Sequence, residues 1–260
     1  MSLSILTNIS AMNTQQNLLD SSNAVAQSME RLSSGLQINS AADDAAGYAI
    51  SEGLTSQVNG LDQASSNTND AISMVQTASS SLNDVENMLQ RIYELGVQYN
   101  NGSNSTTDQT DLQDEVNQLT QEVDREQSSS NFNGLNLLNG TAGTNGTVTF
   151  QVGANSGDTL TATFSGIESS SGLGITGFCW SNASNGGAVF DLGQANALSA
   201  LTTAINNVSS MAATLGAVQN RLQYTSDSIS STEQNLAASN SQIKDVNMAS
   251  EMTNLTQEQI

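Results

Sequence analysis

The sequence of 260 residues contains no proline and no histidine. Proline inside a helix costs about 3 kcal/mol or more, so a chain without it can form long uninterrupted helices. Histidine is the commonest general base near neutral pH and the commonest metal ligand. Its absence, together with the lack of a phosphate-binding glycine loop and of a nucleophile elbow, argues against an enzyme. We expect no catalytic residue, no metal and no cofactor.

Basic residues are also scarce. The chain has five, against 25 acidic residues, for a formal charge of −20. Nucleic acid and anionic membrane surfaces are bound mainly through Lys and Arg, so neither is an expected partner. The single cysteine, Cys179, cannot form an intrachain disulfide. The first charged residue is Asp20, so the start lacks the basic region of a secretory signal peptide.

Composition divides the chain into three parts. Residues 1–130 and 196–260 have few glycines and a helical texture, whereas residues 133–193 are rich in Gly, Ser, Thr and Asn. This contrast predicts a mainly α fold with a small β-rich insertion between two helical arms. The insertion is short, so any separate domain there is small.

The last arm has the clearest helical pattern, a run of apolar residues at a strict period of seven: Leu201, Val208, Leu215, Leu222, Ile229, Leu236 and Ile243. Such spacing keeps one stripe of a helix against a partner in a coiled coil. The alternate positions of this seam become polar toward the C-terminus, so we expect tighter packing early than late. One helix with one stripe is not a stable domain. The pattern therefore predicts a long antiparallel bundle with helices of the first arm.

The first arm carries matching patterns. Leu18, Val25 and Leu32 lie seven apart, interleaved with Met29 and Leu36. Steps of three and four link a second set, Leu61, Ala64, Thr68, Ala71, Val75, Ala78, Leu82, Val85, Leu89 and Ile92, and a third, Leu112, Val116, Leu119 and Val123. Apolar residues at helical spacing are mostly core, which we expect for all three sets.

The middle part shows the period of two that is typical of strands. Val148, Phe150 and Val152 alternate with polar residues, as do Leu160, Ala162 and Phe164, which predicts a hairpin. Further strands are expected at 177–180 and 188–192. Asn-Gly pairs at 139–140, 145–146 and 185–186 mark turns.

Several long motifs resemble bacterial flagellins, in the family's order. They are LSILTNISAMNTQQ at 3–16, RLSSGLQINSAADDAAGYAI at 31–50, NFNGLNLLNG at 131–140, LGAVQNRL at 215–222 and SQIKDVNMASE at 241–251. The match spans about 1–140 and 196–260. It leaves out the middle, which varies among flagellins.

The resemblance implies a domain plan. Residues 1–45 and 244–260 would belong to the filament-core domain, the latter as the start of its C-terminal part. Residues 46–140 and 196–243 would form the helical bundle, and 141–195 the variable insertion. The family normally continues past 254–260 with another helical stretch, so residues 1–260 alone are expected to polymerise poorly.

It also implies a function. Flagellins are structural subunits that are exported through the flagellar type III pathway and polymerise into the extracellular filament for motility. The implied partners are other copies of the chain, the flagellar cap and hook-associated proteins, and a flagellin-specific export chaperone. Nothing in this plan calls for a cofactor.

The segment 90–98 resembles the part of flagellins that contacts neighbouring subunits and that the flagellin-sensing Toll-like receptor binds. By position, Arg91, Leu95 and Glu115 match the residues credited with receptor recognition; Gln90 and Glu94 lie beside them. Receptor-activating flagellins often carry other residues at Tyr93, Gly96 and Leu119. These departures argue against receptor activation here.

Two other functions fit parts of the sequence. The hook–filament junction protein resembles flagellin at both ends, although the motifs at 31–50 and 215–251 favour flagellin. A surface binding module would use the insertion, whose aromatics Phe164, Phe178, Trp180 and Phe190 could stack on a sugar or form a small core.

Overall fold

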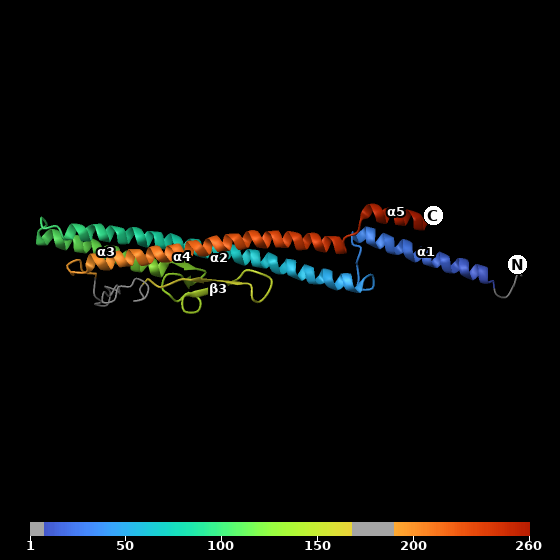
Figure 1. Cartoon of the computed structure of the whole chain (residues 1–260), viewed down its shortest axis with the longest axis horizontal. Helices are drawn as coiled ribbons and strands as arrows, with labels where there is room; N and C mark the ends of the chain where they lie inside the picture. Colours follow the sequence, from blue (N-terminus) through green and yellow to red (C-terminus); the bar gives the residue numbers. More distant parts are fainter. Residues whose placement is uncertain (1–7, 168–189) are drawn as a thin grey trace. The chain divides into compact units, whose positions relative to one another are not determined.

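The computed structural model describes residues 8–167 and 190–260. Helices dominate them (Figure 1): α1 (Ile9–Ser34), α2 (Ala45–Tyr99), α3 (Thr106–Ser129), α4 (Ala197–Lys244) and α5 (Met248–Gln259). The strands are short and lie between α3 and α4 in the sequence. The predicted fold class, mainly α with a small β-rich insertion, is confirmed.

The chain divides into two compact units, Met1–Asp62 with Ser231–Ile260 and Gln63–Ser230. We call them the terminal unit and the central unit. The helices α2 and α4 each contribute residues to both units.

In the central unit, α2, α3 and α4 lie side by side and share one apolar core (Figure 1). All of the predicted α2 positions, from Leu61 in the terminal unit through Ile92, are buried. A short turn after Tyr99 folds α3 back along α2, so these two helices are antiparallel. Val116 and Val123 of α3 are buried, while Leu112 and Leu119 lie at the edge of the core.

The seven-residue seam of α4 is unevenly covered. Its first members are buried, namely Leu201, Val208, Leu215, Leu222 and Ile229. Leu236 and Ile243, at the C-terminal end, are half-buried.

The predicted hairpin is present as β3 (Thr147–Gln151) and β4 (Thr159–Thr163), which pair antiparallel. Its register sets Phe150 opposite Leu160 and Val148 opposite Ala162, so the apolar residues share one face. A smaller hairpin, β1 (Asn131–Phe132) with β2 (Leu135–Asn136), precedes it. Its turn uses Asn133 and Gly134, both with positive φ, a conformation that glycine and asparagine adopt most readily.

The prediction of a strand at 188–192 is wrong for the residues described there, because Phe190–Leu192 is not a strand. The side-chain amide of Gln113 binds this backbone instead: Nε2 donates to Phe190 O at 2.6 Å, and Oε1 accepts from Leu192 N at 2.9 Å. One side chain thus satisfies the groups that a neighbouring strand would otherwise bind. Two predictions lie outside the described residues. They are the strand expected at 177–180, which includes Phe178, Cys179 and Trp180, and the turn expected at 185–186.

In the terminal unit, α1 and α5 lie side by side (Figure 1). The left-handed Gly35 ends α1, and the chain then pairs with the segment after α4: Gln37 N donates to Lys244 O at 2.7 Å and Val246 N to Gly35 O at 3.0 Å. The expectation that the first heptads form core is wrong for Leu18 and Met29. Leu18 is 70% exposed and Met29 57%, because no described segment packs over them.

Candidate functional site

The first candidate surface centres on Arg91, an exposed residue of α2. Its Nη2 lies 2.8 Å from Glu115 Oε1 of α3, and its Nη1 lies 3.3 Å from Glu94 Oε2. Hydrogen bonds from the guanidinium to Glu115 and then to Glu94 raise the pKa of Arg91 above its ordinary value. The structure therefore brings Glu115 of α3 next to Arg91 and Glu94 of α2, although Glu115 is distant from both in the sequence.

The two other residues expected at this surface differ in exposure. Gln90 is exposed and donates from Nε2 to Glu86 Oε1 at 3.4 Å. Leu95 is only 1% exposed and belongs to the core, so it supports the Arg91 surface from beneath. Beside it, a Cβ on Gly96 would lie 2.9 Å from Leu198 Cδ2 of α4.

The first turn of α3 is capped by an acidic residue. Ser105 and Asp108 form a capping box, in which each side chain bonds the other residue's backbone N–H. Hydrogen bonds from the backbone and then the side chain of Ser105 lower the pKa of Asp108. In the terminal unit, Asp43 is held in the same way: backbone and side-chain bonds from Ser40 lower its pKa. Asp43 thus binds its own loop and also accepts from Gln27 Nε2 of α1.

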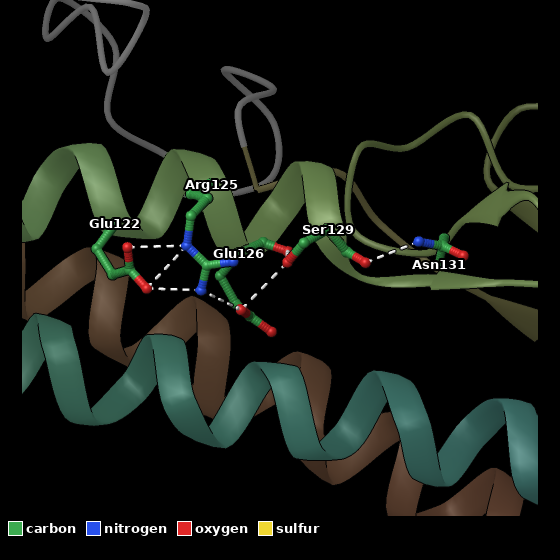
Figure 2. Close-up of polar contacts among 5 residues, drawn as sticks. All are labelled: Glu122, Arg125, Glu126, Ser129 and Asn131. Atoms are coloured by element: carbon green, nitrogen blue, oxygen red, sulfur yellow. Dashed lines mark hydrogen bonds and ion pairs between the residues drawn. The ribbon is translucent and has the colours of Figure 1, made fainter.

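A second charged group lies near the end of α3 (Figure 2). Arg125 Nη2 lies 2.6 Å from Glu122 Oε1 and 3.4 Å from Glu126 Oε2, and Glu126 also accepts from Ser129 Oγ. The hydrogen bonds between Glu122 and Arg125 lower the pKa of Glu122 and raise the pKa of Arg125. All these contacts lie within one helix. They support α3 itself and leave no cation free there for a partner.

The terminal unit carries the other candidate, a group of exposed apolar side chains on α1 and α5. We call it the terminal apolar surface, and its members are Ile9, Met12, Leu18, Leu19, Met29, Met248 and Met252. Exposed apolar residues on two neighbouring helices make this unit a candidate for association.

Polar residues join α1 to α5 in the same unit. Arg31 Nη1 lies 3.8 Å from Glu251 Oε1, and Glu251 is buried. The hydroxyl of Ser28 donates to Glu258 Oε2 at 2.9 Å, and that of Ser21 donates to the backbone O of Glu258 at 3.0 Å. Sequence reasoning missed these pairings, because nothing in residue spacing links positions more than 200 residues apart.

No group of three or more His, Cys, Asp or Glu residues suited to a metal occurs within residues 8–167 and 190–260. Among the same residues, no helix is long and apolar enough to cross a membrane.

Comparison with known proteins identifies the family. Residues 5–143 match the model of the bacterial flagellin N-terminal helical region, and residues 198–260 match that of the C-terminal helical region. The chain is a bacterial flagellin family member. Flagellin of Bacillus subtilis is 39% identical over 97% of this chain and 90% of its own length. The flagellar filament 33 kDa core protein of Treponema phagedenis is 42% identical, with the same coverage.

A solved flagellin also has a similar structure. The crystal structure of Bacillus cereus flagellin superposes with a TM-score of 0.51 at 32% identity, covering 67% of this chain and 94% of that one. Both halves of this flagellin match flagellin models rather than those of another family. The junction-protein and binding-module interpretations are therefore not favoured.

Proposed function

We propose that this flagellin, a structural subunit of the bacterial flagellar filament, polymerises by burying its terminal apolar surface against other copies. The observation that carries the proposal is the exposure of Leu18 and Met29 on a helix whose spacing is that of a packed seam. Burying an apolar side chain of this size stabilises an assembly by about 1.5–3 kcal/mol. A neighbouring copy would supply the missing cover.

Such contacts would be head-to-tail. One surface of a subunit meets a different surface of the next, and a contact of this kind that does not close generates a helical filament. Only 12% of the residues are charged, but the acids outnumber the bases by 25 to five, so like subunits repel one another and the apolar contacts must outweigh that repulsion.

We place a second subunit contact at Gln90, Arg91, Glu94 and Glu115, of which Arg91, Glu94 and Glu115 are joined by the ion pairs of Arg91. Leu95 would fix this surface from the core side. Binding by the animal receptor would need the same residues.

The remaining partners are proposed by analogy with the family. We propose export through the flagellar type III pathway, a chaperone that holds the C-terminal segment beforehand, and assembly under the cap protein beyond the hook-associated proteins. The product would be extracellular.

Seeded polymerisation tests the proposal. Purified protein is added to sheared filament fragments, and elongation is counted by electron microscopy. We expect Leu18→Gln with Met29→Gln to abolish elongation while the circular dichroism of the monomer stays unchanged. The matched control is Leu135→Gln, which alters an exposed leucine outside the terminal apolar surface and should elongate normally. Elongation by the double variant at the unmodified rate would reject the proposed surface, and no growth of the complete unmodified protein, run beside residues 1–260, would reject polymerisation.

A further inference from the structure

The first part of α4 differs in charge from the rest of the chain. Between Ala197 and Ser226 there is no acidic residue, although the whole protein carries 25, and Arg221 is the one base. The neighbouring helix α3 has the opposite character, with many acids and the single base Arg125. Two helices of one unit thus present surfaces of different charge.

Arg221 is also unlike the other bases. Arg31, Arg91, Arg125 and Lys244 all form ion pairs with carboxylates of the chain. Arg221 is exposed and forms no ion pair with any residue in the described ranges. In a chain of formal charge −20, an unpaired guanidinium is available to a carboxylate from outside.

An aromatic side chain stands next to it. Tyr224 is 76% exposed, although it lies on a helix whose opposite side is buried in the core. Its position three residues after Arg221 places both on one face of α4, while Leu222 points into the core. Tyrosine and arginine are the residues most enriched at the energetic centres of protein interfaces. The pair has the composition of such a centre.

A complementary surface exists on α3. Asp111, Asp114 and Glu115 follow the spacing of three and four that puts side chains on one helix face. Asp111 and Asp114 are exposed, and within the described part of the chain Glu115 is the one member of this group that forms an ion pair, with Arg91. This group carries more negative charge than Arg91 neutralises.

We infer that Arg221 and Tyr224 form a docking surface for a second copy of this chain, which presents Asp111 and Asp114 of its α3. The inference rests on the proposed polymerisation and adds to it a specific pair of surfaces. An α4 face meeting an α3 face is heterologous, so each copy keeps one free surface of each kind for the next. Charge complementarity of this type sets the register and speeds association.

Seeded elongation of two variants with equal charge change tests the inference. Arg221→Gln removes one positive charge, and Gln223→Glu adds one negative charge to an exposed residue about 200° around the same helix. We expect Arg221→Gln to slow elongation about five-fold or more at low salt. Gln223→Glu should elongate like the unmodified protein, and Arg221→Lys should recover most of the rate.

The salt dependence gives a second readout. Because salt screens exposed charges, the rate difference between Arg221→Gln and the unmodified protein should shrink as ionic strength rises. A photo-cross-linking residue, p-benzoylphenylalanine, in place of Tyr224 should attach to residues 108–118 of another copy in the polymer. Monomer at the same concentration should give no such product.

The outcomes separate the two proposals. Equal rates for Arg221→Gln and Gln223→Glu, or cross-links only outside α3, would overturn the docking surface and leave polymerisation standing. Failure of the complete unmodified protein to elongate would overturn polymerisation, and the docking surface with it.

Discussion

The carboxylate of Asp108 holds the first turn of α3. Its pKa is lowered by hydrogen bonds that exist only in the folded chain. A group of this kind contributes stability that is fully present above its unfolded pKa. The contribution is lost as the pH falls through the lower folded pKa, below about pH 4 for an aspartate.

The variant Asp108→Asn tests this dependence. At pH 7 it should unfold at a lower urea concentration than the unmodified protein, because the charged capping interaction is gone. The difference in midpoint should shrink when both are measured near pH 3, below the ordinary pKa of an aspartate, because protonation removes the charged interaction. Asp70→Asn, an exposed acid in the middle of α2, serves as the control. A midpoint difference for Asp108→Asn that is the same at both pH values would contradict the assignment.

Glycine 96 is a packing position. An added methyl would lie 2.9 Å from Leu198 Cδ2 and 3.3 Å from Leu192 Cδ2, whereas at Gly216 it would meet nothing within 4 Å. In a helix, Gly→Ala gains about 1 kcal/mol from propensity alone, but overpacking costs about 1–3 kcal/mol. Gly216→Ala should therefore raise the melting temperature and Gly96→Ala should not. Equal increases would show that the space beside Gly96 is open.

At the scale of single elements, the α4 seam predicts a gradient of stability effects. Leu222 is fully buried and Leu236 half-buried. Leu222→Ala should cost about 2–5 kcal/mol, the range for a buried leucine that leaves a cavity. Leu236→Ala removes less buried area and should cost clearly less. Thermal unfolding followed by circular dichroism at 222 nm measures both, and equal losses would contradict the observed packing.

The sequence predicts an element well where the element's partner is within the chain. The three- and four-residue steps of α2 predict its buried positions, because α3 and α4 cover that stripe. The β3–β4 hairpin was predictable for the same reason, since its alternation matches the buried face. In α1 the same kind of spacing was misleading for Leu18 and Met29. Periodicity shows that a face is apolar, and it does not show whether this chain or another covers it.

Side-chain contacts between distant segments escaped prediction. Gln113 binds the backbone at Phe190 and Leu192, and Arg31 meets Glu251, across long stretches of sequence. Each depends on the path of the folded chain rather than on a local pattern. For the Arg91 surface, only family resemblance suggested Glu115, because α2 and α3 must first fold together to bring it near.

At the scale of the whole molecule, the distribution of exposed apolar residues distinguishes a subunit from a self-sufficient protein. Apolar surface left in water is a cost that polymerisation would remove. The central unit has a continuous core of its own, whereas α1 and α5 expose the residues of the terminal apolar surface. Folding and assembly would therefore be coupled in the terminal unit more than in the central one.

Methionine oxidation tests this central claim most directly. Met12, Met29, Met248 and Met252 are exposed in the single chain, and Met74 is buried in its core. Dilute hydrogen peroxide converts accessible methionine to the sulfoxide, which peptide mass spectrometry counts site by site in monomer and in polymer. The account predicts rapid oxidation of the four exposed methionines in monomer, protection of all four in polymer, and slow oxidation of Met74 in both. Equal oxidation of the four in monomer and polymer would contradict burial of the terminal apolar surface on assembly.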